Sequence, residues 1–224
     1  MDKQAIEGSE RQGRVEGMNA SQPAERRELS RSDERVHVYR AQWSFERLSQ
    51  MIREGDRVLN LGAGDCRLDQ RLARDHQCEV VSLDVDDYNE TELPLVLYDG
   101  LHIPFPDDSF DVVLLIFALH HAEDPAAVLR EARRVCRRHI IAFEDLLISL
   151  ADRLVFRGFH RFLKWSQGFP LPQHEWPPQR WSELARDIGL AEIAQKDIGR
   201  TFGYLASRHM AFVWEKTDAA DRTP

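Results

Sequence analysis

Cysteine is scarce in this chain of 224 residues, and the cysteines present form no recognisable pattern. They are Cys66, Cys78 and Cys136, and no two of them make a Cys-x-x-Cys pair. A disulfide framework or a cysteine-ligated zinc site would need regularly spaced cysteines. We therefore expect reduced thiols and a cytoplasmic protein.

The chain also lacks long apolar runs and an excess of positive charge. No run approaches the roughly 20 apolar residues that a membrane-spanning helix needs, and the first residues lack the apolar stretch of a secretory signal. The formal net charge is −8, whereas binding to nucleic-acid phosphates usually requires a basic face. We expect no stable membrane insertion and no nucleic-acid partner. The oligomeric state has no signature in the sequence.

Large apolar residues are almost absent from residues 1–35, which are rich in Glu, Arg, Ser, Gln and Gly. Such a segment buries too little surface to offset the entropy lost on ordering. We expect it to be a disordered extension. Residues 36–216 then form a single domain, and residues 217–224 a flexible tail.

Short apolar runs alternate with amphipathic stretches from residue 57 onward. Continuous apolar runs indicate strands that are buried on both faces, as in parallel sheets. These runs lie at 57–62, 78–85, 93–99, 110–119 and 139–146. Strands alternating with helices are typical of βαβ units. The predicted fold is α/β and Rossmann-like, a doubly wound and mostly parallel sheet with helices on both faces.

Glycines and acidic residues follow the ends of the first three predicted strands. The first strand runs into Gly62-Ala63-Gly64, the second ends at Asp84-Val85, and the third precedes Asp99-Gly100-Leu101. Glycine lets a ligand come close to the backbone, and a carboxylate about 20 residues later can accept hydrogen bonds from ribose hydroxyls. An ordinary turn explains each feature alone. Their combination predicts a cofactor that contains a nucleoside.

Three stretches, VLNLGAGDC, SLDV and YDGLHIPFPDDSFDVVLLIFALHH, carry a resemblance that covers roughly residues 37–216. They resemble the UbiE, or type-11, group of class I methyltransferases. The resemblance implies a seven-stranded sheet with an antiparallel last strand, and S-adenosylmethionine as the cofactor. It also assigns roles: Gly62, Ala63 and Gly64 beside the methionine and ribose, Asp84 with its neighbour Val85 at the ribose, Asp99, Gly100 and Leu101 at the adenine, and Phe117 near the sulfonium.

Two residues depart from the pattern of that group. Asn60 stands where the group usually has an acid beside the methionine amino group, and it keeps an acceptor there without the charge. Cys66 replaces the third glycine of the loop. These departures keep open a non-catalytic scaffold that binds S-adenosylmethionine or S-adenosylhomocysteine. A nicotinamide-dependent oxidoreductase is disfavoured, because the loop lacks the complete Gly-x-Gly-x-x-Gly pattern and the chain has no Tyr-x-x-x-Lys pair.

Methyl transfer is an in-line displacement at a carbon that the sulfonium already activates, so positioning can supply most of the catalysis. A general base is needed only where the acceptor must lose a proton. Our candidates for a catalytic role are His120 and His121 after the fourth strand, and Glu144 and Asp145 at the end of the fifth. Alternatively, the two histidines cap the loop that follows and have only a structural role, and the two acids are solvated loop residues. His120, His121, Glu123 and Asp124 are close in the sequence, but they lack a spacing that fixes metal geometry, so we expect no metal.

The chain after the fifth strand contains a long amphipathic insertion at about 147–178, with aromatic and basic residues interleaved. It can be a lid over an apolar acceptor, a helix resting on a membrane surface, or an extra helix packed on the domain. No Asn-Pro-Pro-Tyr or Asp-Pro-Pro-Tyr motif of DNA amino-methylation follows the fourth strand. We therefore expect a small-molecule methyl acceptor.

Overall fold

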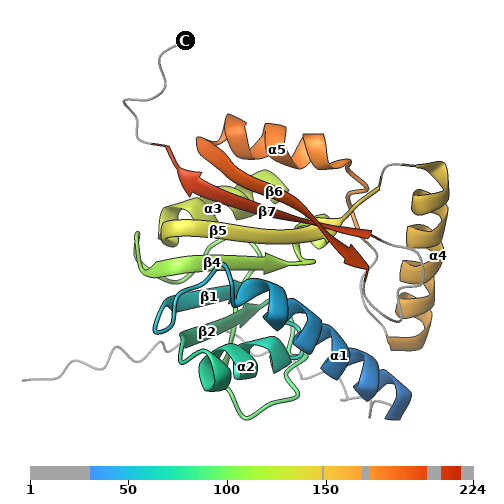
Figure 1. The fold of residues 1–224 in the computed structure, drawn as a ribbon, viewed down its shortest axis with the longest axis horizontal. Coiled ribbons are helices and arrows are strands. Elements are labelled where there is room, and N and C mark those ends of the chain that lie inside the picture. The colour runs from blue at the N-terminus through green and yellow to red at the C-terminus, as the bar shows by residue number, and fades with distance from the viewer. Residues whose placement is uncertain (1–30, 148, 168–171, 201–207, 218–224) are drawn as a thin grey trace, which may run out of the picture.

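A computed structural model describes residues 31–147, 149–167, 172–200 and 208–217. In these ranges seven strands form one sheet in the order β3-β2-β1-β4-β5-β7-β6 (Figure 1). The strands are β1 Arg57–Leu61, β2 Glu79–Asp84, β3 Leu95–Leu97, β4 Phe110–Ile116, β5 Cys136–Asp145, β6 Leu190–Arg200 and β7 Arg208–Lys216. The helices are α1 Arg31–Leu48, α2 Arg67–Asp75, α3 Pro125–Val135, α4 Leu150–Gln167 and α5 Pro178–Asp187, with a short 3-10 turn η1 at Leu119–His121.

The direction of the strands confirms the predicted fold. The pairs β1–β2, β1–β4, β2–β3 and β4–β5 are parallel, whereas β7 runs antiparallel to both β5 and β6. Strand order reverses between β1 and β4. In open α/β sheets, ligands bind beyond the carboxyl ends of the strands at such a reversal.

Two hydrophobic cores lie on opposite faces of the sheet. Val112 and Leu114 of β4 belong to the core that contains residues of α1 and α2. The intervening Val113 and Leu115 belong to the core that contains residues of α3 and α5. Because successive side chains of a strand point to opposite faces, this alternation confirms that helices cover both faces (Figure 1).

Helix α3 begins where the sequence predicts it. The Asp124 side chain accepts hydrogen bonds from the backbone N–H groups of Ala126 and Ala127, at 2.9 and 3.0 Å. Pro125 occupies the first helical position, where a backbone N–H would have no partner in the helix. The helix covers β4 and β5 and so supports the two strands that carry the candidate catalytic residues.

Some boundaries differ from those predicted. Strand β4 ends at Ile116 instead of 119, because Phe117 has a positive φ of 58° that takes the chain out of the strand. Helix α1 begins at Arg31, so the last residues of the expected extension 1–35 are helical. Residues 1–30 and 218–224 lie outside the described part of the chain, and the disorder and flexibility expected there remain predictions.

Helix α4 lies across the carboxyl end of β5 (Figure 1). Its Phe156 and His160 are buried, whereas Leu154 and Trp165 are exposed. Arg157 joins the helix to Glu175 of the following segment at 2.6 Å. Phe156 and His160 both pack against His120 of η1. The lid remains a prediction. Among the described helices, none is both long and apolar enough to cross a membrane.

Candidate active site

The glycine loop after β1 passes very close to the chain that leaves β4. The N–H groups of Gly62 and Ala63 both donate to the carbonyl oxygen of Leu83, at 2.8 and 3.1 Å. Gly62 has a φ of +80°, and a Cβ placed there would lie only 2.7 Å from the Cβ of Ala118. Position 62 therefore requires glycine both for its backbone conformation and for its space.

The Gly62→Ala variant should be about 2 kcal/mol less stable than the wild type, since it combines a left-handed alanine with the clash against Ala118. Gly55 provides a matched control, because it has the same φ of +80° but nothing within 4 Å of a built Cβ. We expect Gly55→Ala to lose only about 1 kcal/mol. Urea unfolding of both variants measures the difference, and equal losses would contradict the close approach to Ala118.

Asp84 ties the ends of β1 and β2 together. Its carboxylate accepts hydrogen bonds from the N–H groups of Gly64 at 2.8 Å and Val85 at 2.7 Å. Burial raises the pKa of this carboxyl, and the backbone hydrogen bonds oppose that rise. A carboxylate has about four acceptor positions, so Asp84 retains the capacity to accept from a ligand at this edge of the sheet.

Asp99 shapes the turn after β3. Its carboxylate accepts from the N–H groups of Leu101 and His102 at 2.8 and 2.7 Å. Its pKa lies well below the usual range, chiefly because of a hydrogen bond from the His102 ring. Asp99 thus forms the turn that the sequence offered as the simpler explanation, and its contact with adenine stays a prediction.

The surface beside that turn is apolar. Val85 is 53% exposed and Leu101 44% exposed, and a Cβ at Gly100 would stand 3.4 Å from Val85 Cγ1. The assignment of Gly100, Leu101 and Val85 to the cofactor stays a prediction.

Asn60 is only 2% exposed, and its side-chain amide donates to Asp69 Oδ1 of α2 at 2.6 Å. The Ser82 hydroxyl donates to the other oxygen of Asp69 at 2.5 Å. Burial raises the pKa of Asp69 to about 7. The sequence analysis missed this buried acid, although its place between Leu68 and Leu72 on the apolar side of a short helix was a signal.

Cys66 caps the start of α2 with a φ of +57°, a conformation that glycine adopts more easily. Its side chain is fully buried, and burial raises the pKa of its thiol to about 12. All three cysteines are free and buried. Position 66 therefore has a backbone conformation that suits the glycine usual in the group. The thiol that replaces this glycine is unreactive, because it is buried and protonated.

Phe117 lies at the end of β4, where the resemblance places the sulfonium. Its N–H donates to the carbonyl oxygen of Phe143 at 2.8 Å. The Arg40 guanidinium lies 4.6 Å from the ring centroid, and the His209 ring lies 4.8 Å away. Phe117 is thus part of an aromatic wall formed by α1, β4 and β7.

The structure brings together His120 and Glu144, two of the predicted catalytic residues. His120 Nδ1 lies 2.5 Å from Glu144 Oε2, and the N–H of Leu119 donates to Glu144 Oε1 at 3.0 Å. Both side chains are almost fully buried. Burial favours the neutral imidazole, but the Glu144 carboxylate outweighs it and raises the pKa of His120.

Asp145 faces a different histidine. It stands opposite His209 in the ladder between β5 and β7, with His209 Nδ1 3.2 Å from Asp145 Oδ1. Burial alone would raise the pKa of Asp145, but the contact with His209 lowers it. The fourth candidate, His121, packs its ring against His120 at a centroid distance of 4.3 Å.

Two histidines of this region, His160 and His209, were missed by the sequence analysis. His160 comes from α4 and His209 from β7, so nothing near them in the sequence connects them to the others. The gathered site contains the predicted His120, His121, Glu144 and Asp145, all at the carboxyl end of β4 and β5.

Residues 59–142, which run from β1 into β5, match the family model described as a methyltransferase domain. This part of the chain is thus similar to methyltransferase domains. The match contains the glycine loop, Asp84, Asp99 and Phe117. The matching family supports S-adenosylmethionine as the cofactor.

The curated relatives of this chain match it over part of their length. A 27-O-demethylrifamycin SV methyltransferase of Amycolatopsis mediterranei is 32% identical over 107 residues, which cover 41% of this chain and 39% of the relative. A demethylmenaquinone methyltransferase of Corynebacterium efficiens is 32% identical over 90 residues, 38% of this chain and 39% of the relative. The chain thus spans about two fifths of the length of these relatives.

Among solved structures, a SAM-dependent methyltransferase from Aquifex aeolicus has a TM-score of 0.59 to this chain. The two share 14% sequence identity, and the alignment covers 82% of this chain and 93% of the other. At that identity the likeness establishes the fold.

Proposed function

We propose that this protein transfers the methyl group of S-adenosylmethionine to a small-molecule acceptor. The observation that carries the proposal is the Asp84 carboxylate at the β2 end, hydrogen-bonded to Gly64 of the loop that follows β1. This junction lies at the carboxyl edge of the sheet and contains the acid that ribose hydroxyls require. The matching family and its named relatives supply the reaction.

The acceptor that we propose is a hydroxylated or quinol-type ring compound. The two relatives are named for methylating a demethylrifamycin and a demethylmenaquinone. In this chain aromatic rings gather near the carboxyl end of β4: Trp43 packs 6.5 Å from Phe117, and Phe156 lies 5.8 Å from His120. Flat apolar compounds suit such rings, and the nearby histidines and carboxylates can orient a polar substituent.

In the proposed reaction, Asp84 holds the ribose and Phe117 borders the sulfonium. His120, His121, Glu144 and Asp145 surround the acceptor side. Holding the acceptor in line with the methyl group means that the translational and rotational entropy is lost on binding and not in the transfer step. The Glu144 contact fixes the orientation of the His120 ring. The three unpaired thiols support a cytoplasmic location, which we also propose.

The test incubates the protein with S-adenosylmethionine labelled on its methyl group and a panel of dihydroxynaphthalenes and hydroxylated macrocycles. Label in the organic extract, with an equal amount of S-adenosylhomocysteine formed, is the expected result. Calorimetric titration with S-adenosylhomocysteine runs in parallel. Binding without transfer to any acceptor would favour the non-catalytic scaffold, and absence of binding to a folded protein would refute the proposal.

A further inference from the structure

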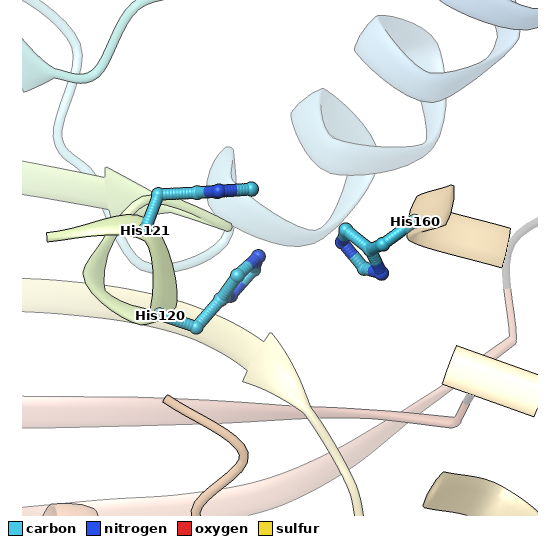
Figure 2. A group of neighbouring side chains, drawn as sticks. All are labelled: His120, His121 and His160. Carbon is cyan, nitrogen blue, oxygen red and sulfur yellow. The ribbon is translucent and has the colours of Figure 1, made fainter. Parts of the chain in front are cut away.

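Three histidine side chains converge at the carboxyl edge of the sheet, from two parts of the chain. His120 and His121 come from η1 and His160 comes from α4, and Figure 2 shows their rings directed toward a common space. One ring nitrogen of each lies within 4.8 Å of the others. Three nitrogens bound to one zinc ion at about 2.0–2.1 Å lie roughly 3.3 Å apart, so modest side-chain rotations would close the set.

We propose that His120, His121 and His160 form a binding site for a divalent transition-metal ion such as Zn²⁺. The sequence predicted no metal because the third histidine is far away in the chain, on the helix that follows β5. The inference does not depend on the proposed methyl transfer.

Hydrogen bonds on the far side of two rings favour this assignment. His120 Nδ1 lies 2.5 Å from Glu144 Oε2, which as a carboxylate oxygen accepts from that nitrogen. His160 Nδ1 lies 3.0 Å from the carbonyl oxygen of Phe156, which can only accept. His160 therefore carries its proton on Nδ1 and its lone pair on Nε2, and Glu144 turns the His120 ring so that Nε2 faces away from the carboxylate. Histidine ligands of metals are oriented by this kind of carboxylate or carbonyl partner.

His121 contributes a different observation. Its Nδ1 is buried and has no hydrogen-bond partner among the described residues. Buried polar atoms in folded proteins normally have a partner. A bound metal ion would supply the missing partner of this nitrogen.

The charges around the cluster balance in favour of a cation. Glu144 and Asp145 face it from β5, and Arg40 faces it from α1. His209 Nδ1 lies 3.2 Å from Asp145 Oδ1. Phe156 closes one side with an apolar ring, 5.8 Å from that of His120 and 4.1 Å from that of His160. Three protein ligands leave one tetrahedral position for water or for an oxygen or nitrogen of the acceptor.

The test uses the full chain without an affinity tag, stripped with a chelator, and titrated with Co²⁺ while visible absorption is recorded. We expect one equivalent of Co²⁺ to bind with the bands of tetrahedral coordination, and Zn²⁺ to displace it. His160→Gln and His121→Gln should each weaken binding by at least ~100-fold, and Glu144→Gln by 10- to 100-fold. The control is His139→Gln at the other end of β5, which should bind as the wild type does.

Absence of stoichiometric binding, or equal binding in the cluster variants and the wild type, would overturn the site. His160→Cys keeps a ligand and should retain binding, which decides the matter if His160→Gln fails to fold. S-adenosylhomocysteine is titrated into the same metal-free samples. If S-adenosylhomocysteine binds but Co²⁺ does not, the metal site alone is refuted. If Co²⁺ binds but S-adenosylhomocysteine does not, the proposed methyl transfer alone is refuted.

Discussion

Replacing Asp84 with alanine should weaken the binding of S-adenosylhomocysteine by at least ~100-fold. The carboxylate is the acceptor for two ribose hydroxyls in the proposed complex, and hydrogen bonds to a charged group contribute about 1.5–3 kcal/mol each. It also fixes the backbone of Gly64 and Val85, so its removal loosens the loop that borders the ligand. Isothermal titration calorimetry on the purified variant measures the loss, with circular dichroism to establish that it folds.

Asp86 provides the matched control for this experiment. It lies two residues after Asp84 in the chain. Its carboxylate accepts a hydrogen bond from the Tyr88 hydroxyl at 3.2 Å. Asp86→Ala should change the affinity less than threefold, because nearby exposed acids act through a screened charge. Equal losses in both variants would mean that general negative charge, and not the placed acceptor of Asp84, holds the ligand.

The sequence places the predicted cofactor residues at one edge of the sheet for a physical reason. Each of these positions is local: Gly62 and Gly64 directly follow β1, Asp84 ends β2, and Asp99 follows β3. Parallel strands bring their carboxyl ends to one edge of the sheet. The buried apolar runs that predict the strands therefore also place these residues together.

The acceptor side is harder to predict, because its contacts join residues far apart in the chain. His209 meets Asp145 only because β7 pairs antiparallel with β5 in that register. His160 meets His120 only because α4 returns across the end of β5. Neither the register nor the return path follows from periodicity. The sequence placed His120 and Glu144 at neighbouring strand ends, but not in direct contact.

Asn60 and Asp69 show how an apparent departure from a family pattern can be offset. The acid expected beside the methionine amino group is absent at position 60, and Asn60 itself is buried. Asp69 nevertheless places a carboxylate 2.6 Å from the Asn60 amide. When Asp69 is ionised, its negative charge therefore lies directly behind Asn60. The protonation state of Asp69 is the property to measure.

Asp69 should make the protein less stable as the pH rises from 5 to 8. Burial raises the pKa of its carboxyl to about 7 in the folded chain, from 3.8 in the unfolded chain. Between these values the folded state binds a proton that the unfolded state has lost, so the free energy of unfolding falls with rising pH. The favourable contribution of the bound proton is complete below pH ~4 and is lost as the pH rises through ~7. The free energy of unfolding should fall by roughly 2–3 kcal/mol between pH 5 and 8.

Asp69→Asn should remove this dependence. The new amide can still accept from Asn60 and can donate to the Ser82 hydroxyl, which is able to accept, so the packing is preserved. Histidines titrate over the same range in both proteins. The informative quantity is therefore the difference between wild type and variant in urea unfolding at pH 5, 6.5 and 8. A difference that stays constant across these pH values would show that Asp69 is already ionised in the folded protein at pH 5, with its charge stabilised by Asn60 and Ser82.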